Sequence, residues 1–178
     1  MEGRVIWITG LSGAGKTSVA KALQQNFTEY GVFSIFLDGD ILRGILEEED
    51  EKGSSYARKD RIKLSQKYSK LCRNLSSQGF TVIIATVSMF DEIYIWNRKN
   101  LPNYFEVYLN VPIKELIKRD PKNIYKNFYL GNISNIAGLD LQVDYPSQAN
   151  LVVDFKSGHT PSKIADIILK KFNLEDEK

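Results

Sequence analysis

Short apolar runs alternate along this chain with longer segments whose apolar residues recur at helical spacing. The runs are rich in β-branched and aromatic residues and lack the regular polar alternation of a strand with one face in water. Such runs are typical of buried parallel strands. We expect strands at residues 5–9, 32–37, 81–85, 104–110 and 151–154.

The segments between these runs predict helices. We expect them at residues 18–27, from residue 41 onward, and at residues 57–78, 90–99, 112–119 and 161–172. Gly31 and Gly79 are natural C-caps for two of them, and the charged tail after Asn173 is expected to fray. Alternating strands and helices predict an α/β fold with three layers, in which helices cover both faces of a five-stranded parallel sheet.

Two stretches show no clear periodicity. Residues 47–52 are a run of charges followed by Gly53, which predicts an exposed loop. Residues 120–148 are polar and hold two prolines and two glycines, so we expect an irregular segment there. The chain is otherwise expected to be a single domain over residues 1–178.

Composition excludes several classes of protein. The hydrophobic fraction of 43% and net charge of +2 are ordinary for a globular protein and give no reason to expect nucleic acid or membrane as a partner. No apolar run approaches the roughly 20 residues of a membrane span, and the first strand begins too early for a secretory signal. We therefore expect a cytoplasmic protein. Cys72 lies at helical spacing with apolar neighbours and is expected in the core, and the single histidine, His159, excludes a His-based metal cluster.

The strongest motif is G-L-S-G-A-G-K-T at residues 10–17, which fits the P-loop pattern G-x-x-x-x-G-K-[ST]. A predicted strand precedes it and a predicted helix follows it, as phosphate binding at a helix N-terminus requires. The glycines let backbone N–H groups turn toward the phosphates. We predict binding of ATP by Gly10, Ser12, Gly13, Ala14, Gly15, Lys16, Thr17 and Ser18.

Asp38 and Asp40 follow the second strand, which we expect to neighbour the P-loop strand. One carboxylate can accept the proton of an attacking hydroxyl while the other orders water around Mg²⁺. We favour Asp40 as the base and assign Mg²⁺ to the Thr17 hydroxyl and Asp38. The alternative is an Asp-Gly turn that only caps the next helix.

Four basic residues are placed to meet anions. Arg43 lies about one helical turn beyond Asp40, and Arg61 begins the long helix, so both can hold the anionic group of an acceptor. Arg119 and Lys122 lie where the chain enters residues 120–148, which we interpret as a lid over the phosphates. We expect Arg119 to contribute to ATP binding from this position. The alternatives are solvated helix faces for the first pair and cations at a helix C-terminus for the second.

These motifs together resemble the adenylyl-sulfate (APS) kinase family. The resemblance runs in order through the P-loop, Leu37–Asp40 with Arg43, Asp60-Arg61, Asn97-Arg98, Arg119–Lys122 and Gly138–Asp140. It implies a nucleoside monophosphate kinase-like P-loop fold and transfer of the γ-phosphate of ATP to the 3′-hydroxyl of a nucleotide. It also implies that Asp38 and Asp40 flank this hydroxyl, and that Lys122 belongs to the lid and takes part in catalysis with Lys16.

The sequence departs from this family where the acceptor base is read. An Asn expected after Arg61 is Leu64, the Pro expected before Phe90 is Met89, and Asn123 replaces a lid Gly. These departures favour a changed acceptor, and relatives that phosphorylate cytidine diphosphoramidate during capsule modification are the alternative to APS. The expected acceptor-binding residues are Asp40, Arg43, Tyr56 as a stand-in aromatic, Arg61, Ser88, Phe90, Lys122 and Ile136.

Two other classes of protein fit less well. A regulatory GTPase needs an Asn-Lys-x-Asp element, which this sequence lacks. A non-catalytic nucleotide-binding module is expected to have lost Lys16 or the acidic pair, and both are present. The expected partner is a small nucleotide acceptor, and the sequence leaves the oligomeric state open, a homodimer included.

Overall fold

The computed structural model describes residues 3–46 and 57–176, and within these ranges five parallel strands form one sheet in the order β2-β3-β1-β4-β5. Trp7 in the central strand pairs with Ile84 of β3 on one side and Glu106 of β4 on the other. The strands are β1 (Arg4–Thr9), β2 (Ser34–Asp38), β3 (Thr81–Ala85), β4 (Tyr104–Asn110) and β5 (Leu151–Asp154).

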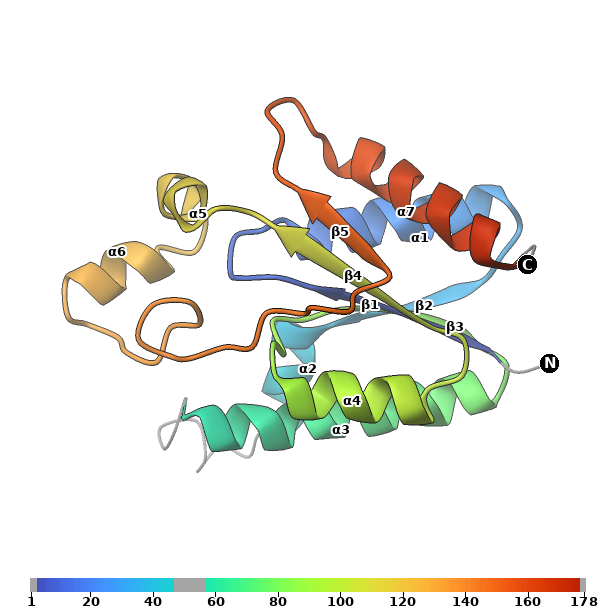
Figure 1. The fold of residues 1–178 in the computed structure, drawn as a ribbon, viewed down its shortest axis with the longest axis horizontal. Helices are drawn as coiled ribbons and strands as arrows, with labels where there is room; N and C mark the ends of the chain where they lie inside the picture. The colour runs from blue at the N-terminus through green and yellow to red at the C-terminus, as the bar shows by residue number, and fades with distance from the viewer. Residues whose placement is uncertain (1–2, 47–56, 177–178) are drawn as a thin grey trace.

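Helices cover both faces of the sheet, as predicted (Figure 1). One layer holds α1 and α7, and the opposite layer holds α2, α3 and α4. The short helices α5 and α6 extend beyond the carboxyl ends of the strands. The helices are α1 (Lys16–Glu29), α2 (Gly39–Leu46), α3 (Arg58–Ser77), α4 (Asp91–Asn100), α5 (Ile113–Arg119), α6 (Ile124–Tyr129) and α7 (Pro161–Asp176).

The apolar strands hold these layers together because successive side chains point to opposite faces. Ile6 and Ile8 of β1 pack in the core under α1 and α7, while Val5 and Trp7 pack in the core under α3 and α4. All four side chains are fully buried. Cys72 is buried in the second core, as predicted from its spacing.

Three expectations about the fold were wrong. The second strand does not neighbour the first, because β3 lies between β1 and β2, and local apolar patterns do not encode strand order. Helix α6 interrupts the segment expected to be irregular; it is too short to show a periodicity, and the Asp120 carboxylate fixes its start by accepting from the backbone N–H groups of Tyr125 and Lys126. Helix α7 continues to Asp176, beyond the predicted end at Phe172.

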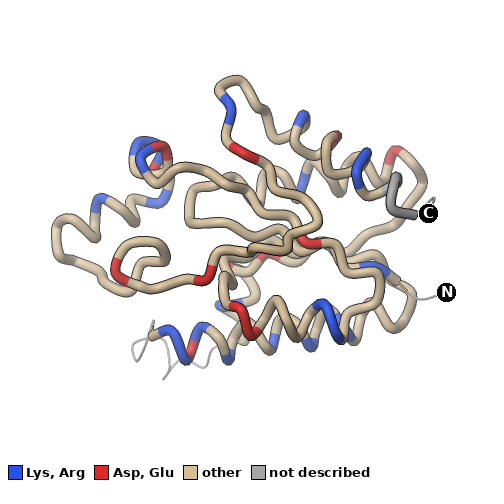
Figure 2. The backbone as a smooth tube through the Cα atoms, viewed as in Figure 1, with Lys and Arg blue, Asp and Glu red and all other residues tan. Residues whose placement is uncertain are grey.

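Charges are distributed over the whole fold. Figure 2 shows Lys and Arg on helices of both layers and on α5 and α6, interspersed with Asp and Glu. Among the described helices, none combines the length and the hydropathy that crossing a bilayer requires.

Candidate active site

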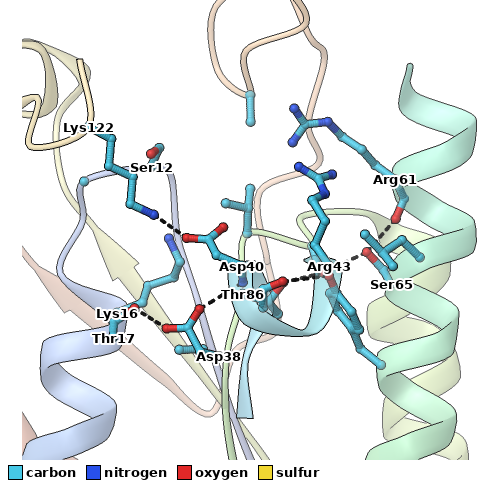
Figure 3. A pocket seen from close by; sticks show the side chains of 18 of the residues that line it. Ser12, Lys16, Thr17, Asp38, Asp40, Arg43, Arg61, Ser65, Thr86 and Lys122 are labelled. Atoms are coloured by element: carbon cyan, nitrogen blue, oxygen red, sulfur yellow. Dashed lines mark hydrogen bonds and ion pairs between the residues drawn. The ribbon is translucent and has the colours of Figure 1, made fainter. Parts of the chain in front are cut away.

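A cavity of about 270 Å³ opens at the carboxyl ends of β1, β2 and β3, where the P-loop, α2, α3 and the segment after α5 meet (Figure 3). Parallel strands deliver their following loops to one edge, so residues distant in sequence gather there. The predicted residues that line it are Ser12, Gly13, Gly15, Lys16, Thr17, Ser18, Asp38, Asp40, Arg43, Arg61, Ser88, Phe90 and Lys122.

The P-loop wraps one side of this cavity. Gly13 and Gly15 have φ values of 78° and 95°, in the left-handed region that favours glycine, and α1 begins directly afterwards at Lys16. The Lys16 ammonium donates to the carbonyl oxygen of Leu11 at 2.9 Å. Burial lowers the pKa of Lys16 from 10.5 to about 8; the nearby Lys122 lowers it too, whereas Asp40 and Asp38 raise it. A buried cation of this kind gains stability from an anionic ligand.

Asp38 links β2 to the P-loop although the two strands are not neighbours. Its Oδ2 accepts from the Thr17 hydroxyl at 2.7 Å, and its Oδ1 accepts from the backbone N–H of Asp40 at 2.9 Å. The second contact lies at the start of α2, so the side chain holds the turn as well as facing the P-loop. The turn interpretation and the site interpretation are therefore compatible.

Asp40 presents its carboxylate to the cavity from the first turn of α2 and pairs with Lys122. Burial alone would raise the pKa of Asp40, but the hydrogen bond and charge of Lys122, with the charges of Lys16 and Arg43, outweigh it and lower the pKa below its usual value. Asp40 is therefore ionised at neutral pH and able to accept a proton.

Two arginines line the cavity from different helices. Arg43 projects from α2 and Arg61 from α3, and Figure 3 shows both guanidinium groups on the side of the cavity away from Lys16. Arg61 Nη2 donates to the backbone oxygen of Asn135 at 2.8 Å, which ties α3 to the segment after α6. The cavity thus has cations at both ends, an arrangement suited to a ligand with two anionic groups.

Sequence analysis missed a face of α3 that lines the cavity with Arg61 and Leu64. Ser65 and Tyr68 belong to this face, and the Tyr68 hydroxyl donates to the Gly39 oxygen at 2.8 Å. Their spacing from Arg61, at four and seven residues, was the signal that could have found them. Thr86, at the carboxyl end of β3, lines the cavity as well. Ala137 and Leu141 of the segment after α6 also line it and were missed.

The cavity lining does not test two of the predicted acceptor-binding residues. Tyr56 falls outside the described residues. Ile136 is buried in the core under α1 and α7, while its neighbour Ala137 lines the cavity, so an acceptor contact of Ile136 stays a prediction. Phe90 is buried and faces the cavity, with the Arg58 guanidinium 5.2 Å from its ring centroid on another side.

The predicted lid contacts the P-loop directly. The Tyr125 hydroxyl of α6 donates to the Ser12 oxygen at 2.9 Å, and burial raises the pKa of Tyr125 to about 12, so the hydroxyl remains a donor. Pro121 and Lys122, at the start of this segment, line the cavity. The segment therefore lies over the P-loop in this structure.

Arg119 lines a second cavity, of about 250 Å³, which shares Gly15 with the first. Its guanidinium stacks over Phe155 at 5.0 Å from the ring centroid, and Gly15, Val19 and His159 line the same cavity. This cavity adjoins the P-loop, and its lining combines apolar side chains with a planar cation.

The donor set for Mg²⁺ consists of hard oxygens. The Thr17 hydroxyl and the Asp38 carboxylate are adjacent, and no cluster of three or more His, Cys, Asp or Glu suited to a metal exists among the described residues. Mg²⁺ is commonly held by one or two protein oxygens together with substrate phosphates and water. These two residues fit that mode and would not form a protein cage for a metal alone.

The parallel sheet, the P-loop and the acidic pair define a P-loop kinase. The sequence profile of adenylylsulphate kinases matches residues 2–154, so the chain belongs to the adenylylsulphate kinase family. The predictions of this family of phosphotransferases and of this fold class are confirmed.

Three similar proteins illustrate the range of the family. A cytidine diphosphoramidate kinase of Campylobacter jejuni is 39% identical over 96% of each chain. An adenylyl-sulfate kinase of Pseudomonas aeruginosa is 33% identical over 94% of this chain and 82% of its own. The structure of the Mycobacterium tuberculosis APS kinase CysC in complex with AMPPNP and APS superimposes with a TM-score of 0.86 at 28% identity, covering 97% of this chain and 98% of that one.

Because the pKa of Lys16 is about 8, binding of a triphosphate should be linked to proton uptake. Phosphate favours the ammonium form, so it raises this pKa, and ATP affinity should fall as pH rises through about 8. Calorimetric titration with ATP at pH 9, in buffers of different ionisation enthalpy, should show uptake approaching one proton, and at pH 7 almost none. Lys21→Ala, an exposed change on the same helix, should behave like the wild type. No proton uptake at the higher pH would contradict this account of Lys16.

Proposed function

We propose that this protein is an ATP-dependent kinase that phosphorylates the 3′-hydroxyl of a small nucleotide, with APS as the first candidate acceptor. The observation that carries the proposal is the ionised Asp40 carboxylate in the same cavity as Lys16 and two arginines. A base and a phosphate-binding cation on one side, with further cations on the other, suit phosphoryl transfer between two anionic ligands.

In the proposed reaction the acceptor hydroxyl lies between Asp40 and the γ-phosphate. Its oxygen forms a bond to the γ-phosphorus while its proton passes to Asp40, and the bond from γ-phosphorus to the β,γ-bridging oxygen breaks to release ADP. Lys16 and Lys122 neutralise charge on the transferring group. Arg43 and Arg61 hold the anionic tail of the acceptor, and Phe90 offers an aromatic surface for its base.

The donor nucleotide extends from the P-loop into the second cavity. Arg119 and Phe155 provide planar surfaces there for its base, so Arg119 contributes to ATP binding from outside the first cavity. Mg²⁺, held by Thr17 and Asp38 together with the phosphates, would neutralise charge on the β- and γ-oxygens. Asp38 accepts two hydrogen bonds that fix its carboxylate, which suits a positioning role and leaves Asp40 as the base.

The same proposal treats residues 1–178 as one kinase domain, with residues 120–148 as its lid and the cytoplasm as its location. The contact of Tyr125 with Ser12 supports the lid because it joins this segment to the phosphate-binding loop. A homodimer is compatible with the proposal.

Cytidine diphosphoramidate is the second candidate acceptor. Leu64 lines the acceptor side of the cavity where an Asn is usual among APS kinases, and a cytidine diphosphoramidate kinase is 39% identical to this chain. An apolar side chain at this position removes a polar partner from the base and changes which base fits. Both acceptors carry an anionic tail that Arg43 and Arg61 can hold.

If Asp40 is the base, Asp40→Asn should lower kcat by about 10² to 10⁴ and leave ATP affinity nearly unchanged. Asp38→Asn should instead weaken binding of ATP with Mg²⁺, because this residue contacts Thr17.

Lys122 lowers the pKa of Asp40, so Lys122→Met should raise the pKa of Asp40 and move the acid limb of the kcat profile to higher pH. Steady-state kinetics from acid to neutral pH measures all three effects, and wild-type kcat in Asp40→Asn would exclude Asp40 as the base.

The acceptor is identified by comparing kcat/KM for APS and cytidine diphosphoramidate with purified protein, ATP and Mg²⁺. We expect phosphorylation of at least one, and loss of several orders of magnitude in Lys16→Ala, with Lys21→Ala as the matched control. A clear preference for APS would assign an ordinary APS kinase, and preference for the cytidine nucleotide would assign the second candidate. Turnover of neither would contradict the proposed function.

A further inference from the structure

Three buried hydroxyl groups form a chain along the acceptor side of the first cavity. Ser65 of α3 is 3% exposed, Thr86 at the end of β3 is 6% exposed, and Ser88 is 5% exposed. The Oγ atoms of Ser65 and Ser88 are 2.7 Å apart, and Thr86 Oγ1 is 2.8 Å from Ser88 Oγ. All three residues line the cavity, and Figure 3 shows the dashed contacts running between Thr86 and Ser65 and onward to the Arg61 backbone.

One end of this chain fixes its direction. Ser65 Oγ lies 2.7 Å from the Arg61 carbonyl oxygen, which can only accept, so the Ser65 hydroxyl donates its one hydrogen to this oxygen. Ser88 must then donate to Ser65, and Thr86 must donate to Ser88. With all three hydrogens used inside the chain, Thr86 has only its acceptor lone pairs to offer a ligand.

The position of Thr86 puts these lone pairs beside the proposed reaction centre. A Cβ atom built on Gly39 would lie 2.9 Å from Thr86 Oγ1, so this oxygen lies against the turn that joins Asp38 to Asp40. Ser88 has a φ of 23°, a strained value for a residue with a side chain, so surrounding contacts must hold it in place. Its side chain is therefore fixed between Thr86 and Ser65.

The hydrogen-bond polarity of Thr86 differs from most of its surroundings. Lys16, Arg43, Arg61 and Lys122 all offer donors, which recognise the anionic parts of the two ligands. Asp38 already accepts from Thr17 and from the Asp40 backbone. Thr86 is thus a neutral acceptor in a cavity dominated by donors, which suits an uncharged N–H or O–H group of a ligand.

We propose that the Thr86–Ser88–Ser65 chain selects the acceptor nucleotide by requiring a hydrogen-bond donor opposite Thr86. This inference rests on the proposed function and names a specificity device within the same site. The ribose 2′-hydroxyl and an exocyclic amino group of the base both supply such a donor. A carbonyl oxygen at that place would face lone pairs, and a hydrogen on carbon would leave Thr86 without a partner.

Modified acceptors separate the two sources of the donor. The probes are APS and cytidine diphosphoramidate, their 2′-deoxy analogues, and their inosine and uridine counterparts, in which a carbonyl replaces the amino group. For one of these two changes, loss of the 2′-hydroxyl or loss of the amino group, the dissociation constant from calorimetry should rise about 10- to 100-fold. The value of kcat/KM should fall by a similar factor. Sensitivity to 2′-deoxy analogues assigns the ribose, and sensitivity to deaminated bases assigns the amino group. Equal affinity for all analogues would overturn the inference.

Two variants test whether this selectivity comes from the hydroxyl chain. Thr86→Val keeps the shape of the side chain and leaves no donor unpaired, because Ser88 still donates to Ser65. The discrimination among nucleotide analogues should disappear in this variant. Ser65→Ala frees the Ser88 hydrogen to point at Thr86, which releases the Thr86 hydrogen to the cavity. Discrimination should then fall or reverse toward analogues that carry an acceptor. Ser69→Ala, which removes another buried hydroxyl from α3 outside the cavity lining, is the matched control and should keep the wild-type ratio.

The readouts distinguish failure of this inference from failure of the proposed function. Phosphorylation of a nucleotide with no discrimination among its analogues, or with unchanged discrimination in Thr86→Val, overturns the hydroxyl chain alone. Discrimination in binding that disappears in Thr86→Val, without phosphorylation of any acceptor, overturns the proposed reaction and retains the chain as the recognition device. Failure of every nucleotide to bind the wild type would overturn both.

Discussion

The hydrogen bond from Thr17 to Asp38 joins the phosphate-binding loop to the acidic turn after β2, and the site depends on both. Strands β1 and β2 are separated by β3, yet their carboxyl ends must meet if the phosphate-binding loop and the acidic turn are to share a cavity. Because all five described strands are parallel, their carboxyl ends lie at one edge of the sheet. The 2.7 Å hydrogen bond between Thr17 and Asp38 then connects the loops that follow β1 and β2. Asp38 also accepts from the Asp40 backbone, so the same side chain places the proposed base.

Without its ligands, this site destabilises the fold electrostatically, because it holds a buried cation close to a second one. Lys16 is buried with its pKa lowered to about 8, and Lys122, which pairs with Asp40, adds a second cation nearby. Phosphate groups supply negative charge beside the buried Lys16 ammonium, so binding a phosphate offsets part of the desolvation cost of this cation. On the acceptor side, the proposed roles are different: the arginines would bind the anionic tail, and the hydroxyl chain ending at Thr86 would add a directional requirement for an uncharged donor group.

The sequence predicts the elements of this fold better than their arrangement. Strands β3, β4 and β5 have the predicted bounds, because apolar runs are local signals. The position of β3 between β1 and β2 is a property of the whole sheet, and the local sequence of β2 does not predict it. In the site, the P-loop and the Asp38–Asp40 turn are readable as motifs, whereas Ser65 and Thr86 belong to no motif and become neighbours only when α3 packs on β3. Arg119 was predicted near ATP, but the sequence could not show that it lies in a separate cavity.

In the proposed reaction, Asp40 receives the acceptor's proton in a cavity at one edge of the sheet. Determination of a ternary structure with a non-hydrolysable ATP analogue, Mg²⁺ and the acceptor nucleotide tests it most directly. We expect the acceptor hydroxyl within hydrogen-bond reach of Asp40 and in line with the γ-phosphate, and Lys122 turned from Asp40 to the phosphates. An acceptor hydroxyl placed away from Asp40 and beside another group would contradict it.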